Sequence, residues 1–373
     1  MNKHLAHLWL TTIIILIISC KQKAEENSFD FEVNGKPILS LKGQKFSFEQ
    51  LVNPSQISSI NEFLIVVENS RVPEDYPVMH IVDRNAMEYL RPKGKKGIGP
   101  NEITDAHLVD PGFSDSTFWV NSSMSKRMAE FSLYDTSLLS VHEFKQPEKM
   151  LTTFKIYKAT DSTYLGRATT DDNIFNEYDL NGNRINGYGA WPSIPNQEKV
   201  LGSFDKPTQN FLLGNLNDGR FRKDPFSKLF VLAMAYRNRI EFLDYESKAV
   251  WYIENPNTEI PTYRIGGSGA NVVAAYSWDA EYTYMDVAFG NKGMYALFSG
   301  VSQNYYREAS KLAETIFVLT KKGKVMAKLQ LDASIRSIAV DENLGKIYGI
   351  TTDEDPGIAV FDMPQELLDL LAE

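Results

Sequence analysis

The chain has 373 residues, of which 43% are hydrophobic and 12% aromatic, and its formal net charge is −9. A composition this rich in apolar and aromatic residues excludes a disordered protein and is typical of a globular, strand-rich one. The negative charge disfavours nucleic acid as a partner, because a phosphate backbone attracts basic surfaces.

The first 19 residues have the features of an export signal. Lys3 supplies a positive charge, Leu8 to Ile18 form a short apolar core, and Ser19 is a small residue directly before Cys20. The apolar core is too short to favour a helix that spans the membrane. The alternative is an uncleaved membrane anchor in which the cysteine is incidental.

Cys20 is the only cysteine, so an exported chain of this sequence cannot form an internal disulfide. Residues 17–20 (IISC) resemble the lipobox of bacterial lipoproteins, in which the cysteine is acylated and becomes the new N-terminus. The resemblance implies that residues 1–19 are removed, that an acylated Cys20 anchors the protein in a membrane, and that residues 20–28 form a polar tether. Because Lys21 rather than Asp follows the cysteine, it also implies an outer membrane lipoprotein of the cell envelope, either periplasmic or surface-facing.

The rest of the chain, residues 29–373, repeats short apolar runs that are separated by turn residues. Six copies of this pattern predict one all-β domain, a six-bladed β-propeller. The strands expected in the first three copies are 57–60, 63–67, 78–82 and 87–90; 107–109, 117–120, 128–134 and 138–144; and 154–157, 164–167, 174–178 and 184–188. Those expected in the last three are 210–213, 229–234, 240–243 and 249–253; 285–288, 294–298, 316–319 and 325–331; and 338–340, 347–350 and 358–361.

Two features of the copies support a propeller. The second runs, such as FLIVV at residues 63–67, are continuously apolar, which indicates burial on both faces between neighbouring blades. Most third runs end in an aspartate, which we interpret as the first residue of a turn rather than as a member of a carboxylate ring. These aspartates are Asp83, Asp135, Asp179, Asp244 and Asp362.

The ends of the chain are expected to complete the ring. The sixth copy has only three strands, so its last blade should be closed by an N-terminal strand, either residues 29–33 or residues 38–41. After Pro364, the leucines of QELLDLLAE lie on one helical face and predict a short C-terminal helix that covers an edge of the ring.

Residues 96–103 (KGIGPNEI) resemble the G-x-G-P-G-E-[FY] signature of the TolB-like six-bladed β-propeller lipoprotein family. Asn101 replaces the usual glycine and Ile103 the usual aromatic residue. The segment lacks the GK[ST] ending of a phosphate-binding loop, so we expect a structural turn in which Glu102 accepts backbone amides. The matching residues are Gly97, Gly99, Pro100 and Glu102.

The sequence has few residues in patterns that suit catalysis or metal binding. His80, His107 and His142 stand singly in expected strands, with no second ligand at metal-binding spacing. The chain has no G-x-S-x-G elbow and no cysteine beyond Cys20. We therefore predict no catalytic residue, no metal and no cofactor, and keep a metal-dependent propeller enzyme of the lactonase or lyase type as the alternative.

Binding is the favoured function, and the segments that interrupt the repeat are where it is expected. Residues 214–228 and 300–314 are interpreted as loop insertions, with a solvated turn at 215–224, and residues 275–286 add aromatic side chains. Arginine and aromatic residues in loops suit a protein, peptide or glycan partner, although such rings also pack the rim of a domain. The candidate ligand-binding residues are Arg220, Arg222, Trp278, Tyr282, Tyr284, Tyr305, Tyr306 and Arg307.

Overall fold

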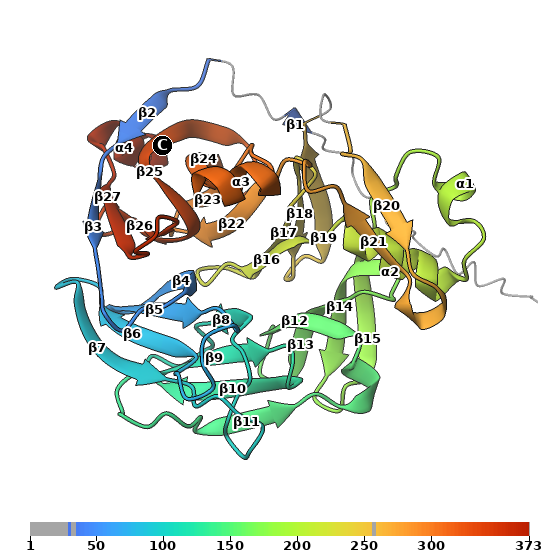
Figure 1. The fold of residues 1–373 in the computed structure, drawn as a ribbon, viewed down its shortest axis with the longest axis horizontal. Helices are drawn as coiled ribbons and strands as arrows, with labels where there is room; N and C mark the ends of the chain where they lie inside the picture. Colours follow the sequence, from blue (N-terminus) through green and yellow to red (C-terminus); the bar gives the residue numbers. More distant parts are fainter. Residues whose placement is uncertain (1–28, 31–34, 256–258, 373) are drawn as a thin grey trace, which may run out of the picture.

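The computed structural model describes residues 29–30, 35–255 and 259–372. In this part of the chain, six antiparallel blades stand around a central axis (Figure 1). This confirms the predicted all-β six-bladed propeller. The expected signal peptide and tether, with Cys20, lie outside the described residues.

The first three blades contain the predicted strands, with small shifts at their ends. In each, the first strand lies nearest the axis and the fourth lies at the rim (Figure 1). The strands are β4 (Pro54–Ile60), β5 (Phe63–Glu68), β6 (Met79–Asp83) and β7 (Glu88–Lys93); β8 (Leu108–Asp110), β9 (Thr117–Ser122), β10 (Arg127–Ser132) and β11 (His142–Lys145); and β12 (Thr153–Lys158), β13 (Thr163–Ala168), β14 (Asn173–Asp179) and β15 (Arg184–Ala190).

The fifth and sixth blades share a long strand, β25 (Val325–Asp341). Residues 325–330 of β25 pair with β24, and residues 335–341 pair with β26, so one strand ends a blade and starts the next. The other strands of these two blades are β22 (Tyr284–Phe289), β23 (Gly293–Phe298), β24 (Ala313–Thr320), β26 (Lys346–Thr351) and β27 (Ile358–Asp362).

An N-terminal strand closes the sixth blade as predicted, but it is neither of the two expected runs. The closing strand is β3 (Gly43–Phe46), which pairs antiparallel with β27. β2 (Ile38–Leu41) lies instead parallel to β25, and β1 (Phe29–Asp30) lies parallel to β19 of the fourth blade. The prediction failed because an outermost strand needs little hydrophobicity.

The close fit of β3 depends on its glycine. Gln44 and Lys45 of this strand are exposed, so the sequence GQKF carries no apolar pattern. A Cβ atom on Gly43 would lie 2.6 Å from Cε1 of the buried Phe361, so the missing side chain lets β3 approach β27. β2 is apolar for a different reason, since Leu41 is 3% exposed and belongs to the core.

The fourth blade also differs from the prediction at its first strand. Residues 210–213, expected as a strand, lie in α2 (Lys206–Leu216), where Asp205 caps the first turn by accepting from Thr208 N at 2.9 Å. The first strand is β16 (Gly219–Lys223), within the segment expected to be a solvated turn. The rest of the blade is as predicted: β17 (Leu229–Met234), β18 (Arg239–Asp244) and β19 (Ala249–Glu254).

Several elements lie outside the six blades. α2, the short α1 (Gln197–Leu201) and a hairpin of β20 (Tyr263–Gly266) and β21 (Val273–Tyr276) lie together beside the third and fourth blades (Figure 1). α3 (Gln303–Ala309) connects β23 to β24. Two short 3-10 helices are η1 (Glu148–Met150) and η2 (Gly269–Asn271).

The predicted C-terminal helix is α4 (Gln365–Ala372). Leu367 is fully buried and Leu371 is 7% exposed, and both join the apolar cluster between the fifth and sixth blades. No helix in the described ranges is both long enough and apolar enough to cross a membrane.

Six apolar clusters of described residues fill the spaces between neighbouring blades. β5 shows why the second strands are continuously apolar. Ile65 and Val67 face the cluster shared with the second blade, whereas Leu64 and Val66 face the cluster shared with the sixth. Each such side chain contributes about 1.5–3 kcal/mol by burial, so the stability of the ring depends on every interface between blades.

Four of the five predicted aspartates, Asp83, Asp135, Asp179 and Asp244, accept backbone amides of the turns that follow them, whereas Asp362 pairs with Lys346 instead. Asp83 Oδ1 accepts from the backbone N–H groups of Asn85 and Ala86, both at 2.8 Å. Asp244 Oδ1 accepts from Glu246 N at 2.9 Å and Ser247 N at 3.2 Å. These bonds start the hairpin that leads to the fourth strand.

Candidate functional site

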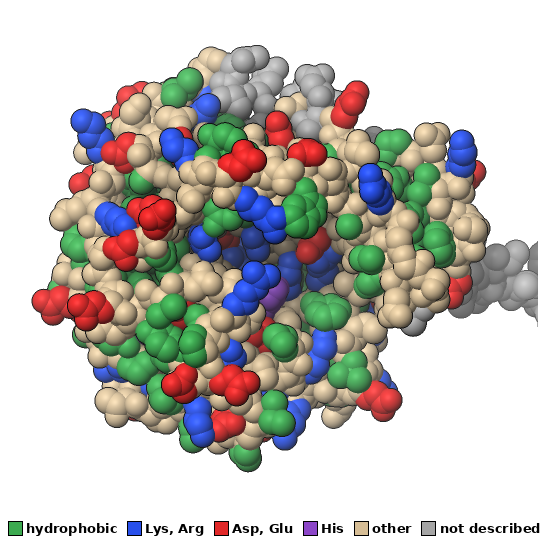
Figure 2. Space-filling view, in the orientation of Figure 1, with side chains coloured by type: hydrophobic (Ala, Val, Ile, Leu, Met, Phe, Trp, Pro, Cys, Tyr) green, Lys and Arg blue, Asp and Glu red, His purple; other side chains and the backbone are tan. Residues whose placement is uncertain are grey.

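A cavity of about 320 Å³ lies where the first strands of the blades converge. Figure 2 shows Lys and Arg side chains and a His around a hollow at the centre of the ring. The cavity is thus a polar site rather than an apolar plug. Its lining is Ser55, Gln56, Glu68, Asn69, Ser70, Asp105, Ala106, His107, Arg220, Arg222, Met285, Asp286, Tyr306, Leu312, Arg336 and Ser337.

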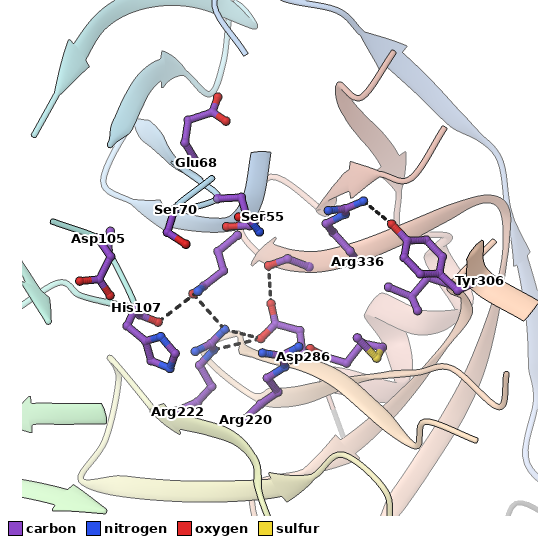
Figure 3. A pocket seen from close by; sticks show the side chains of 16 residues that line it. Ser55, Glu68, Ser70, Asp105, His107, Arg220, Arg222, Asp286, Tyr306 and Arg336 are labelled. Atoms are coloured by element: carbon purple, nitrogen blue, oxygen red, sulfur yellow. Dashed lines mark hydrogen bonds and ion pairs between the residues drawn. The ribbon is translucent and has the colours of Figure 1, made fainter. Parts of the chain in front are cut away.

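The alternation of β16 places two arginines in this cavity. Phe221 is 1% exposed and packs into the cluster between the third and fourth blades. Because successive side chains of a strand point to opposite faces, Arg220 and Arg222 on either side of it face the axis (Figure 3).

An ion pair between Arg222 and Asp286 lies in the lining of the cavity and joins the fourth blade to the fifth. Arg222 donates to Asp286 Oδ1 from Nη2 at 2.6 Å and from Nε at 3.0 Å, and Asp286 is 1% exposed. Burial alone would lower the pKa of Arg222, but the charge of Asp286 outweighs it and raises that pKa. The Ser337 hydroxyl donates to the other oxygen, Oδ2, which also accepts from Ile338 N at 3.2 Å. Asp286 therefore has a partner on both oxygens.

Gln56 extends this network to two more blades. Its side-chain nitrogen donates to the carbonyl of His107 at 3.1 Å, and its side-chain oxygen accepts from Arg222 Nη2 at 3.5 Å (Figure 3). With Asp286 and Ser337, the network joins residues of the first, second, fourth, fifth and sixth blades. It consequently fixes the blades relative to one another at the axis.

Two other arginines of the cavity have no acidic partner. Arg220 donates from Nε to the carbonyl of Met285 at 2.6 Å, and Arg336 donates from Nη2 to the Tyr306 hydroxyl at 2.6 Å. Arg336 Nε is buried without a hydrogen-bond partner. Burial lowers the pKa of Arg220 from its ordinary value. Among the described residues, neither arginine forms an ion pair.

A second charged cluster lies beside the cavity, on the side of the third blade. Lys155 Nζ donates to Asp218 Oδ1 at 3.0 Å and to the carbonyl of Gly219 at 2.5 Å, and Arg167 also pairs with Asp218. Burial lowers the pKa of Lys155 to about 8. Desolvation would raise the pKa of Asp218, but the charges of Lys155 and Arg167 outweigh it and hold that pKa well below its ordinary value.

His107 gives the site a pH dependence. Burial lowers the pKa of His107 to about 4, and the charges of Lys155 and Arg220 act in the same direction. Between pH 4 and the ordinary value of 6.5, the unfolded chain therefore binds more protons than the folded chain, so stability falls as the pH falls through this window.

We expect the neutral His107 to cost the protein about 3 kcal/mol of stability when the pH falls from 7 to 4. Urea unfolding of the wild type and of His107→Gln over this range measures the effect. The wild type should lose more stability than the variant by about that amount. Parallel pH profiles would show that His107 is not held neutral.

The structure separates the sequence-predicted ligand residues into three groups. Arg220, Arg222 and Tyr306 line the cavity, but on β16 and α3 rather than in irregular loops. Tyr284 is fully buried on β22 and donates to Asn238 Oδ1 at 2.5 Å, so it belongs to the core and is not open to a ligand.

The remaining candidates lie away from the cavity. The guanidinium carbon of Arg307 lies 3.9 Å from the centre of the Trp278 ring, and Tyr305 on the same helix is 46% exposed. Trp278 borders a separate depression beside the β20–β21 hairpin. Tyr282 is half-buried, with its ring 5.0 Å from that of Tyr236.

The sequence reasoning missed Gln56, His107, Asp286, Ser337 and Arg336 as site residues. Each stands in or next to the first strand of a copy, where a polar side chain interrupts an otherwise apolar run. That shared position was the available signal, because the first strands line the axis of a propeller.

The glycine-rich segment forms a turn between the first and second blades. Gly99 N donates to Glu102 Oε2 at 2.9 Å, and Asn101 has a φ of 60°, a left-handed conformation that asparagine tolerates. Arg127 donates to the carbonyls of Gly99 at 2.7 Å and Ile98 at 2.8 Å. A Cβ atom on Gly97 would lie 2.1 Å from Glu102 Oε2, so a side chain at this position would have to displace the Glu102 carboxylate; Pro100 lies in the same turn.

The described residues contain no group of three or more His, Cys, Asp or Glu side chains placed to hold a metal ion.

The model of the family described as TolB-like 6-blade propeller-like matches residues 48–343, which is well over half of the chain. The chain belongs to this family. No similar protein was found among curated sequences. The family match agrees with the blades and with the signature-like turn at residues 96–103.

Solved structures resemble this TolB-like propeller in fold. A member of the DUF4221 family from Bacteroides vulgatus has a TM-score of 0.53 at 10% identity, covering 86% of this chain and 98% of its own. A chain described as an exported protein from Bacteroides fragilis has a TM-score of 0.48 at 11% identity, covering 87% and 98%. The β-propeller domain of Cps50 (Swd1) from Myceliophthora thermophila has 0.47 at 10%, covering 86% and 100%.

Proposed function

We propose that this TolB-like propeller is a binding module of the cell envelope that takes a protein or peptide partner at the mouth of its central cavity. The observation that carries the proposal is the cavity itself. It is about 320 Å³ in volume, within the range of ligand sites, and it holds Arg220 and Arg336, which have no ion pair with any described residue. Two partly buried cations without a paired carboxylate are costly to a protein that does not use them.

The same proposal places the protein on a membrane through an acylated Cys20, as an outer membrane lipoprotein. It is supported by the apolar leader, the lipobox-like residues 17–20 and the absence of any other cysteine. Cys20→Ser is expected to move the protein from the membrane fraction to the soluble fraction, as measured by immunoblotting of fractionated cells. A variant that stays in the membrane would argue for an uncleaved anchor.

Two matched double variants test where the partner binds. Tyr306→Ala with Arg336→Ala removes an aromatic residue and an arginine from the cavity, whereas Trp278→Ala with Arg307→Ala removes the same two types of side chain from the outer surface. The unaltered protein and both variants are immobilised and incubated with envelope extracts. Each retained partner is then purified and titrated against all three proteins.

We expect the cavity variant to weaken binding of the purified partner at least tenfold and the outer variant to leave it unchanged. The reverse result would move the binding surface to Trp278 and Arg307. Retention of a glycan instead of a protein would change the class of partner, and binding that neither variant alters would contradict the proposal.

A further inference from the structure

We propose that the cavity recognises a carboxylate group, so that the partner presents an acidic peptide segment whose carboxylate lies between Arg220 and Arg336. This inference rests on the proposed function, since it names the chemistry of the group that enters the cavity. The lining residues leave part of their hydrogen-bonding capacity unused.

The two arginines keep most of their donors free. A guanidinium group offers five N–H donors. Arg220 uses Nε on the carbonyl of Met285, and Arg336 uses Nη2 on the Tyr306 hydroxyl. No ion pair within the described chain engages either group. Both therefore retain a charge and several directed donors that face the cavity (Figure 3).

The acidic residues of the lining are already engaged. Asp286 accepts from Arg222 and Ser337. Asp105 Oδ1 accepts from the Ser122 hydroxyl at 2.6 Å and from Met124 N at 3.1 Å.

Glu68 is engaged in the same way. It accepts from Val52 N at 3.0 Å and from Asn53 N at 2.7 Å, and its side chain is fully buried. None of the three lining carboxylates forms an ion pair with Arg220 or Arg336, so among the described residues neither guanidinium group has an acidic side chain in direct contact.

The charge of the cavity lining favours a ligand group with a single negative charge. Three arginines, including Arg222, stand against the carboxylates of Glu68, Asp105 and Asp286, and His107 is neutral above about pH 4. The balance is near zero, so a phosphate dianion would be repelled by the fixed carboxylates more strongly than a carboxylate monoanion. A planar carboxylate also matches the fork of a guanidinium, which allows two parallel hydrogen bonds.

The surroundings suit a peptide that carries this carboxylate. Asn69, Ser70 and Tyr306 add uncharged polar groups beside the arginines, and Met285 and Leu312 supply apolar surface. Polar groups of this kind can bond to the backbone of an extended peptide while the apolar side chains contact its stems. Because the whole protein carries a net charge of −9, an acidic segment is attracted only where cations are concentrated.

The test uses the full chain in detergent micelles and isothermal titration calorimetry. The probes are acetylated and amidated tetraglutamate, the matched tetraglutamine, and inorganic phosphate. We expect tetraglutamate to bind, tetraglutamine not to bind, and phosphate to bind more weakly than tetraglutamate. Arg220→Gln with Arg336→Gln should weaken tetraglutamate binding at least tenfold, as expected for the loss of charge-assisted hydrogen bonds.

Arg307→Gln is the matched control, since it removes an arginine outside the cavity and should leave binding unchanged. Arg336→Lys keeps the charge without the fork; it should retain the wild-type unfolding midpoint and weaken binding, which separates recognition from folding. The inference is overturned if tetraglutamate does not bind, if phosphate binds more tightly, or if the cavity variants bind as the wild type does. If a partner binds in a way that requires Tyr306 and Arg336 but tetraglutamate does not displace it, the proposed function stands and the carboxylate inference fails.

Discussion

Deletion of residues 1–47 is expected to abolish cooperative folding and to give aggregates, whereas deletion of residues 1–36 is expected to leave a folded monomer. The longer deletion removes β3, which covers the outer edge of β27 and joins the N-terminal part of the chain to the last blade. Without β3, the N–H and C=O groups of β27 form an open edge that pairs with other chains. Size-exclusion chromatography and urea unfolding measure both effects.

An intermediate deletion separates the two N-terminal strands. Removal of residues 1–42 takes away β2 but keeps β3, and exposes the surface that Leu41 covers. We expect a monomer that is less stable by about 2–3 kcal/mol, the contribution of one buried leucine. If the deletion of residues 1–47 unfolded in one transition at the midpoint of the shortest deletion, closure by β3 would be refuted.

A point variant addresses the same closure without shortening the chain. Gly43→Val places side-chain atoms where a Cβ atom already comes within 2.6 Å of the buried Phe361 ring, so overpacking is expected to cost about 1–3 kcal/mol. Gln44→Val on the exposed face of the same strand is the control and should be tolerated.

Asp286→Ala is expected to destabilise the protein by about 3–5 kcal/mol, because it leaves Arg222 buried without a counter-charge. It also removes the acceptor for Ser337 and Ile338 N, which ties the fifth blade to the sixth. The loss is a large fraction of the 5–15 kcal/mol that typically separates folded from unfolded chains. Urea unfolding at pH 7 measures it.

Two variants control for this prediction. Asp362→Ala removes an exposed carboxylate whose ion pair with Lys346 lies at the surface, and it should cost less than about 1 kcal/mol. Adding Arg222→Met to Asp286→Ala should restore part of the stability, because the unpaired charge is then absent. If Asp286→Ala changed the free energy of unfolding by less than about 1 kcal/mol, the network around Arg222, Asp286 and Ser337 would not hold the blades together.

Much of the fold could be predicted because local patterns and burial agree along the chain. In β5, four consecutive apolar residues belong alternately to the clusters on either side of the first blade. A strand buried on both faces cannot tolerate polar residues at any of these positions, so its sequence is distinctive. The aspartate turns after the third strands mark the hairpins in the same local way.

The two strands that were not predicted, β3 and β16, lie where burial does not require an apolar sequence. β3 lies at the rim, so GQKF needed only a glycine for close approach and no apolar pattern. β16 lies at the axis, where Arg220 and Arg222 face a polar cavity, so its alternation of glycine, arginine and phenylalanine resembled a turn. In both strands, the neighbouring elements decide the structure.

The sequence by itself determined the class of fold, the number of blades and the C-terminal helix, because each depends on short runs of adjacent residues. The tertiary structure decided which strand closes the ring and which side chains form the cavity. His107, Arg220, Asp286 and Arg336 are far apart in the chain, and they converge only because each stands in or next to the first strand of a different blade. Which of their charges are paired and which of their donors stay free depends on this convergence, so neither can be predicted from a local sequence pattern.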